Sequence, residues 1–166
     1  MIITHAEPDQ LDAIMVLEEE SFPHQEVWSA QAWSEELNSS EACVMVSADA
    51  DGVILGVAAF RCVADMADLD RVIVHPAARR QGIAAKLILA GLDWAQASGA
   101  DRMLLEVRTD NQPAVCLYRR LGFDEISQRR DYYGPGHDAW VMLRPIGDES
   151  SSQDEYQFEL YRDSAR

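Results

Sequence analysis

Cysteine is scarce in this sequence. Three of the 166 residues are cysteines, Cys43, Cys62 and Cys116, and they are odd in number and far apart. A disulfide framework needs paired cysteines, and a common structural zinc site needs closely spaced pairs. The sequence therefore argues against both, predicts no metal site, and leaves packing in the core as the expected role of all three side chains.

A long apolar run is also missing. A membrane-spanning helix needs about 18 or more consecutive apolar residues, and no run here reaches that length. The first residues, MIITHAEPDQ, have no basic stretch followed by an apolar one, which a secretory signal requires. We therefore expect a cytoplasmic protein that has no membrane partner.

Basic residues are absent from the first third of the chain. Residues 1–60 contain 12 acidic residues and no lysine or arginine, whereas residues 61–145 contain 11 acidic and 12 basic residues. Residues 146–166 are again acidic, with six acidic and two basic residues. Nucleic acid needs a basic face, so we do not expect it as a partner. The acidic flanks either favour a cationic acceptor or only keep the protein in solution.

Apolar periodicity and turn residues predict the order of the elements. We expect a strand at residues 1–5, a helix entered through Pro8, a second helix capped by Ser29, a hairpin around Asp51-Gly52, a strand after Asp65, a helix from about Gly82 to Ala97, a strand at 101–108, a helix that ends at Gly122, and a final antiparallel pair. This order predicts one mixed α/β domain over residues 1–145. Residues 146–166 are rich in serine and acid, which predicts a solvated tail whose YQFELY segment could form a short strand or an interaction segment.

The segment RRQGIAAK, residues 79–86, joins a predicted strand, LDRVIVHP, to a predicted helix. A helix start offers unpaired backbone N–H groups, and a glycine there lets a phosphate approach closely. Two arginines, Arg79 and Arg80, add positive charge, although such a segment also occurs at ordinary loop-to-helix junctions. The spacings G-x-x-x-x-G-K-[ST] and G-x-G-x-x-G are absent, so the segment does not predict a nucleoside triphosphate or dinucleotide site.

Several segments together resemble the GNAT superfamily of N-acetyltransferases, which use acetyl-coenzyme A. The resemblance is carried by R-x-x-G-x-A (Arg79, Gly82 and Ala84), LEVR (105–108), Asn111 with Ala114, LYRRLGF (117–123) and Tyr132-Tyr133. It runs from about His5 to Leu143. Within the superfamily the chain is most similar to the RimI type, which acetylates the N-terminal alanine of a small-subunit ribosomal protein. The resemblance implies a mostly antiparallel, twisted sheet with a splayed parallel strand pair and flanking helices.

The resemblance also implies how acetyl-coenzyme A binds. Its pyrophosphate would be held by backbone N–H groups of Gln81, Gly82, Ile83, Ala84 and Ala85, with Arg79 and Arg80 as supporting charges. Its pantetheine arm would pair with the main chain of Val72, Ile73 and Val74. For Asn111 the residues themselves favour a helix cap before Pro113, and the resemblance adds a contact to pantetheine.

Two residues are candidates for the chemistry, and each has a second interpretation. Alternation in MLLEVR places Glu106 on the opposite face from Leu105 and Val107, where a glutamate is usually solvated. The resemblance makes Glu106 the general base instead. Helical spacing favours packing for Tyr118, whereas the resemblance makes it the general acid toward the departing thiolate.

The acceptor side differs from the RimI pattern. The resemblance implies that Tyr132 and Tyr133 shape the groove for an acceptor peptide, although such a pair can also be rim aromatics of a hairpin. RimI-type chains read F-P-W-S, but here HQEV separates Phe22-Pro23 from Trp28-Ser29. The resemblance implies that this loop, with Trp28, belongs to the acceptor side, so the departure bears on peptide preference and not on the coenzyme half.

The leading hypothesis is therefore an enzyme that moves acetyl from acetyl-coenzyme A to a protein N-terminus, by direct transfer in a ternary complex. A ribosomal protein is the acceptor that the resemblance suggests. The alternatives are an acetyltransferase for a small-molecule amine or a lysine side chain, and a coenzyme A-binding module without catalysis. The joint presence of Glu106 and Tyr118 argues against the last of these.

Overall fold

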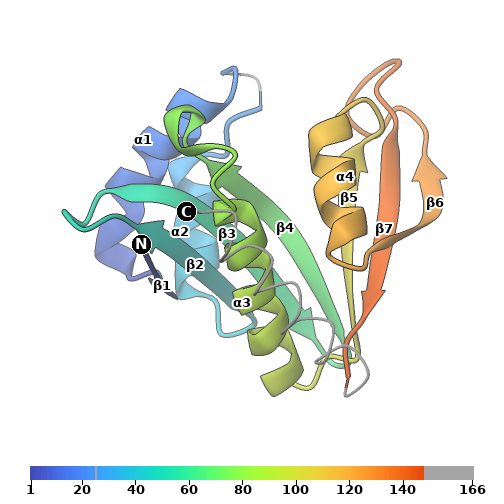
Figure 1. The fold of residues 1–166 in the computed structure, drawn as a ribbon, viewed down its shortest axis with the longest axis horizontal. Coiled ribbons are helices and arrows are strands. Elements are labelled where there is room, and N and C mark those ends of the chain that lie inside the picture. Colours follow the sequence, from blue (N-terminus) through green and yellow to red (C-terminus); the bar gives the residue numbers. More distant parts are fainter. Residues whose placement is uncertain (25, 148–166) are drawn as a thin grey trace.

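The computed structural model describes residues 1–24 and 26–147, which form one sheet covered by helices (Figure 1). Within these residues, seven strands lie in the spatial order β1-β2-β3-β4-β5-β7-β6. They are β1 (Ile2–His5), β2 (Ala42–Ala48), β3 (Ile54–Val63), β4 (Met66–Val74), β5 (Arg102–Arg108), β6 (Asp124–Arg129) and β7 (Ala139–Pro145). The helices are α1 (Leu11–Ser21), α2 (Ala30–Asn38), α3 (Ile83–Ala97) and α4 (Gln112–Arg120), with 3-10 turns at Pro8–Gln10 and Pro76–Ala78. The expected mixed α/β fold is confirmed, and residues 148–166, most of the predicted tail, lie outside the described residues.

The sheet opens between β4 and β5. Among the strands that the structure describes, all pairs are antiparallel except these two, which pair in parallel only from Met66 with Arg102 to Asp68 with Leu104. Both strands continue beyond this point, and Figure 1 shows them diverging like the arms of a V. The splayed parallel pair that the resemblance implied is therefore present.

A β-bulge lies at the opening of this V. Ala59 pairs with Arg71 and Phe60 pairs with Leu69, so Asp70 is an extra residue on β4. The bulge changes the face of the sheet to which the odd-numbered residues of β4 point. Before it, Ala67 and Leu69 point toward α3, and after it the odd-numbered Arg71 and Ile73 point toward α1. Bulges bend a strand and redirect its side chains.

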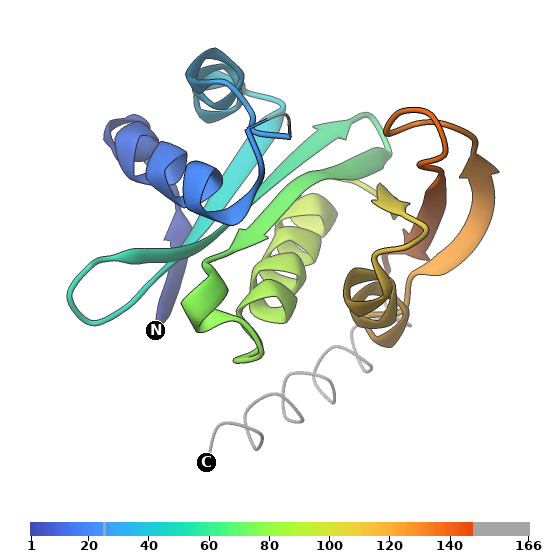
Figure 2. The same ribbon diagram turned by 90° about the horizontal axis from the view of Figure 1, so that it is seen from above.

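Helices cover the two faces of the sheet in pairs (Figure 2). One face carries α1 and α2 over a core cluster that contains Ile14, Trp33 and Ile73, and the other carries α3 and α4. Burial alternates along β5, with Leu105 and Val107 in the cluster under α3 and α4. Glu106 therefore lies on the α1 and α2 face of the sheet, as alternation predicts.

Close packing of α3 on the sheet depends on a glycine. A Cβ atom at Gly91 would lie 2.1 Å from Cζ of Phe60, a residue that is fully buried on β3. No side chain larger than hydrogen fits there without movement of the ring. This contact fixes α3, and with it the start of α3 at the opening of the V.

Most local sequence signals are confirmed. The Ser29 hydroxyl accepts a hydrogen bond of 3.1 Å from the Ala32 N–H and caps α2, and the Asn111 carboxamide accepts one of 3.3 Å from Ala114 at the start of α4. The hairpin at Asp51-Gly52 joins β2 to β3, with Gly52 at a φ of +84°. The helix expected to enter through Pro8 begins with a 3-10 turn before α1.

The sequence predicted that the cysteines pack in the core. This prediction is confirmed for Cys43, which is buried, and is wrong for Cys116, which is exposed on α4. The buried face of this helix carries Val115 and Tyr118, which turns Cys116 toward solvent. In the part of the chain that the structure describes, no helix is both long enough and apolar enough to cross a membrane.

Candidate active site

The start of α3 has the form of an anion-binding loop. Arg80 and Gly82 both have left-handed backbone angles, with φ of 67° and 77°. Lys86 makes the first helical hydrogen bond, to the Gly82 carbonyl, and over residues 1–24 and 26–147 no side chain caps this helix. The N–H groups of Ile83, Ala84 and Ala85 therefore lack helical partners and can bind an anion.

The two arginines of this loop are placed differently. The Nε atom of Arg79 donates a hydrogen bond of 3.1 Å to the Val74 carbonyl and ties the loop to the end of β4. Arg80 is exposed. Part of the function of Arg79 is therefore structural, which the sequence did not predict.

One edge of β4 faces the opening. Val72 pairs with Ala58 and Val74 pairs with Gly56 on the β3 side, while the ladder to β5 ends at Asp68. The backbone groups of residues 69–74 that face β5 thus have no strand partner among the described residues. An extended, amide-containing ligand could pair with this edge.

A groove lies on the α1 and α2 face beside this edge. Its volume is about 430 Å³, and it is lined by Trp28, Glu36, Arg61, Leu69, Asp70, Arg71, Glu106, Tyr132 and Tyr133. Four residues that the sequence selected, Trp28, Glu106, Tyr132 and Tyr133, are thus brought together from three separate parts of the chain. The charged residues of α2, β3 and β4 were missed.

Glu106 is held from one side of the groove. Its side chain is 32% exposed, and Nη1 of Arg129 lies 3.2 Å from its Oε1. The Arg129 guanidinium also lies 4.4 Å from the ring centre of Tyr132, which meets Tyr133 edge to face at 4.9 Å. The two tyrosines are therefore connected to Glu106 through one arginine.

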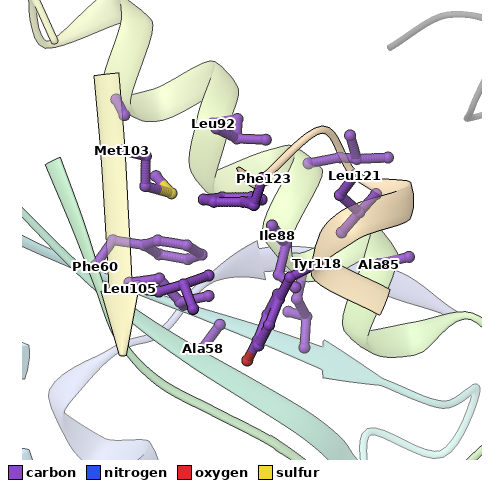
Figure 3. Close-up of a cluster of buried hydrophobic side chains, with 14 of the residues drawn as sticks. Ala58, Phe60, Ala85, Ile88, Leu92, Met103, Leu105, Tyr118, Leu121 and Phe123 are labelled. Atoms are coloured by element: carbon purple, nitrogen blue, oxygen red, sulfur yellow. The ribbon is translucent and has the colours of Figure 1, made fainter. Parts of the chain in front are cut away.

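Tyr118 lies on the other face of β5. It is 6% exposed, belongs to the cluster under α3 and α4, and its ring centre is 6.0 Å from that of Phe123. Figure 3 shows its hydroxyl pointing away from Leu121 and Phe123. Burial raises the pKa of Tyr118 above its usual value, so the phenol is protonated at neutral pH. Glu106 and Tyr118 thus lie on opposite sides of β5, and Tyr118 does not line the groove.

A buried carboxylate anchors the loop on the acceptor side. Glu18 is fully buried on α1 and accepts hydrogen bonds from the Trp28 N–H at 2.9 Å, from Nε1 of Trp33 at 3.1 Å, and from Arg71. Arg71 also donates to the Glu26 carbonyl at 2.7 Å. The connection from α1 to α2 is thereby fixed to β4 next to the groove.

These missed residues left a weak signal in the sequence. Glu18 falls on the same helical face as Ile14, the spacing of a buried residue, but the run Glu18–Glu20 is also typical of a solvated helix end. Asp70 and Arg71 interrupt an otherwise apolar strand segment. Charged residues at such positions are candidates for a site or for a buried ion pair.

Within the described residues, no group of three or more His, Cys, Asp or Glu side chains has an arrangement that could hold a metal ion. The carboxylates of the groove are instead interleaved with guanidinium groups. Arg61 lies 2.5 Å from Glu36 and 4.0 Å from Asp70. The chemistry available here is that of carboxylates, phenols and guanidinium groups.

The sheet thus opens beside an uncapped helix start, and a carboxylate and a phenol lie on opposite faces of β5. The model of the acetyltransferase (GNAT) family matches residues 9–123. The chain belongs to this family and is an acetyltransferase.

Two relatives and one solved structure are similar to this chain. A [ribosomal protein bS18]-alanine N-acetyltransferase of Salmonella typhimurium is 35% identical over 120 residues, which are 69% of this chain and 81% of the relative. An uncharacterised protein of Mycobacterium leprae is 33% identical over 149 residues, and the match spans 87% of this chain but 40% of the longer relative. The crystal structure of the ribosomal-protein-S18-alanine N-acetyltransferase of Escherichia coli superposes with a TM-score of 0.80 at 28% identity, covering 89% of this chain and 94% of that one.

Proposed function

We propose that this acetyltransferase moves acetyl from acetyl-coenzyme A to the N-terminal α-amine of a protein, and that an alanine-starting ribosomal protein is an acceptor. The observation that carries the proposal is the groove that Glu106, Trp28, Tyr132 and Tyr133 line beside the open edge of β4. The names of the Salmonella typhimurium and Escherichia coli relatives support the acceptor.

Acetyl-coenzyme A could bind both sets of backbone groups that lack protein partners within the described part of the chain, at the start of α3 and on the open edge of β4. The uncapped N–H groups from Ile83 to Ala85 suit a pyrophosphate, and the residues on the open edge of β4, Val72 to Val74, suit the amide groups of pantetheine. Arg80 supplies positive charge near the helix start. Asn111 caps α4 through its carboxamide oxygen, which leaves its amide nitrogen for a contact with the pantetheine arm.

Glu106 and Tyr118 divide the proton transfers between them. An α-amine has a pKa of about 8, so its ammonium form loses a proton easily near neutral pH. A single carboxylate is then a sufficient general base. Glu106 takes a proton from the amine on the α1 and α2 face. Tyr118, protonated and buried, gives a proton to the departing thiolate on the α3 and α4 face.

The test compares peptides that differ only in their N-terminus. The protein is incubated with acetyl-coenzyme A and lysine-containing peptides that begin with alanine, serine or methionine. The matched control is the same peptide with a formylated N-terminus. Acetylation of the free N-terminus and none of the formylated peptide is the expected result, and acetylation of the lysine alone would contradict the proposal.

A small-molecule amine is the second candidate, because three carboxylates, Glu36, Asp70 and Glu106, line the groove. A polyamine or an aminoglycoside carries several cations that such a groove attracts. Competition between these amines and the alanine peptide decides between the candidates. A polyamine turned over with a higher kcat/KM than every peptide would favour the second.

A further inference from the structure

Conversion of an ammonium to an amide removes two protons from one nitrogen. The overall reaction is R–NH3⁺ plus acetyl-coenzyme A giving R–NH–CO–CH3, coenzyme A thiol and one H⁺. One proton must leave before the nitrogen lone pair can attack, and the second must leave as the C–N bond forms. Two proton acceptors near the amine would serve these two steps, and the mechanism above has assigned only Glu106.

Asp70 is a second carboxylate at the same groove. It is the extra residue of the β4 bulge, so its side chain is directed to the α1 and α2 face where Glu106 also lies. The two carboxylates come from β4 and β5, the two arms of the V, and they line one groove. Both carboxylates therefore border the space that an amine bound in this groove would occupy.

The two carboxylates differ in their partners. Glu106 is paired with Arg129 at 3.2 Å. In residues 1–24 and 26–147 the Asp70 carboxylate accepts no hydrogen bond, and its one ion-pair partner, Arg61, lies 4.0 Å away and is engaged with Glu36 at 2.5 Å. Asp70 is thus free to take a proton from a ligand, and its side chain is 31% exposed toward the groove.

We propose that Asp70 is the first proton acceptor of the reaction and that Glu106 is the second; this rests on the proposed function. The Asp70 carboxylate takes a proton from the ammonium, and the freed lone pair forms the C–N bond to the acetyl carbon. Glu106 takes the second proton from the nitrogen. The C–S bond then breaks, its electron pair stays on sulfur, and the sulfur takes the proton of Tyr118. Solvent returns one of the two carboxyl protons to Tyr118 and removes the other.

The surroundings of Asp70 match it to this task. Burial, the largest cause, and the negative charges of its neighbours raise the pKa of Asp70 to about 7, against the effect of Arg61. The charged and titratable groups that act on Asp70 or line its groove are Glu36 of α2, Arg61 of β3, Asp68 and Arg71 of β4, Glu106 of β5, and Tyr132 and Tyr133 before β7. A proton acceptor works best when its pKa is near the working pH, and an α-ammonium of pKa about 8 can pass its proton to such a carboxylate with little cost.

The test is the pH dependence of kcat in the variant Asp70→Asn, measured with saturating acetyl-coenzyme A and acceptor. We expect kcat to fall at least about tenfold and the rise of kcat with pH near 7 to disappear. The conservative variant Asp70→Glu should recover part of kcat and keep a rise with pH. Carbon-13 NMR titration of the aspartate carboxyl groups checks the assignment independently, since one signal near pH 7 should vanish in Asp70→Asn.

The matched control is Asp68→Asn, an aspartate two residues earlier on β4 that does not line the groove. Because the Asp68 charge helps raise the pKa of Asp70, this variant should keep kcat within about twofold and move the rise to lower pH. A structural role alone would change stability without removing the pH dependence.

The outcomes separate this inference from the proposed function. If Asp70→Asn keeps the wild-type kcat and pH profile, or if only KM changes, Asp70 is not a proton acceptor and the proposed function stands. If the wild-type enzyme acetylates a small amine and no peptide, the proposed function is wrong. The pH dependence of kcat in Asp70→Asn is then compared with that of the wild type on this amine, because two protons must leave any ammonium. An enzyme that acetylates no amine would overturn both.

Discussion

Arg71 on β4 and Glu18 on α1 form an ion pair whose side chains are 16% and 0% exposed. Removal of one member leaves a buried charge without its partner, which typically costs about 3 to 5 kcal/mol. We expect Glu18→Gln to lower the free energy of unfolding by about 2 kcal/mol, since the amide keeps some hydrogen bonds. Urea denaturation measures this. A loss below about 0.5 kcal/mol would show that the pair contributes little.

The same variant should alter function, because Glu18 and Arg71 together hold the connection from α1 to α2 at the groove. KM for the acceptor peptide should rise in Glu18→Gln, while the Kd for coenzyme A should stay within about twofold. Steady-state kinetics and calorimetry supply the two numbers. Equal losses for both ligands would point to general loosening of the fold instead.

Gly82→Glu should abolish coenzyme binding, because it places a carboxylate at the uncapped helix start and forces a side chain into a left-handed φ of +77°. Arg80→Ala should weaken binding only by about threefold to tenfold, since an exposed charge contributes roughly 1 kcal/mol. Calorimetric titration with coenzyme A measures both. Arg120→Ala, at an exposed arginine of α4, is the charge control. A larger loss of coenzyme affinity from Arg80→Ala than from Gly82→Glu would show that the arginine side chain, and not the backbone N–H groups, is the main binding group.

Tyr118→Phe should lower kcat by about a hundredfold, the scale of a lost general acid. The Kd for coenzyme A should stay nearly the same, because the ring still fills the place beside Phe123. Single-turnover kinetics at saturating substrates make the measurement. An unchanged kcat would leave packing as the whole role of this tyrosine.

Asp70→Asn should also stabilise the protein in a pH-dependent way. The pKa of Asp70 is raised in the folded state to about 7 from 3.8, so the folded state binds this proton more tightly than the unfolded state. The resulting stability is fully present below about pH 4 and is lost as the pH rises through 7. The variant should therefore match the wild type at pH 4 and exceed it at pH 8, by on the order of 1 kcal/mol after solvent screening is allowed for. Thermal unfolding at both pH values tests the sign.

Gly91→Ala should destabilise the fold, because the new methyl group would meet the Phe60 ring. Overpacking of this kind costs about 1 to 3 kcal/mol, more than the helix propensity of alanine returns. Gly99→Ala is a poor control because of its φ of +95°, so urea denaturation compares Gly91→Ala directly with the wild type. A variant as stable as the wild type would mean that the ring moves aside freely.

The sequence predicted the elements well because their signals are local. Ser29, Asn111 and Gly122 act within a few residues of their own positions, and alternation alone placed Glu106 on the correct face of β5. The splayed pair was available only through the resemblance, since no local pattern tells where two parallel strands separate.

The groove could be predicted only in part, because its residues are far apart in the sequence and are brought together by the pairing of the strands. The Glu18–Arg71 pair joins residues 53 positions apart, and nothing near either residue indicates the other. The β4 bulge also defeats alternation, which would have placed Arg71 on the same face as Leu69. Cys116 was misjudged because the boundary between the buried and exposed faces of α4 falls between neighbours.

The bulge at Asp70 lets β4 carry one residue more than its partner strand. A deletion of this single residue would restore strict alternation and leave the faces unchanged, because Leu69 would still point toward α3 and Arg71 toward α1. Arg71 would therefore keep Glu18 as its partner, while the groove would lose the Asp70 carboxylate. Homologues without this residue should hold the acceptor loop as this protein does and differ in the charge of the groove.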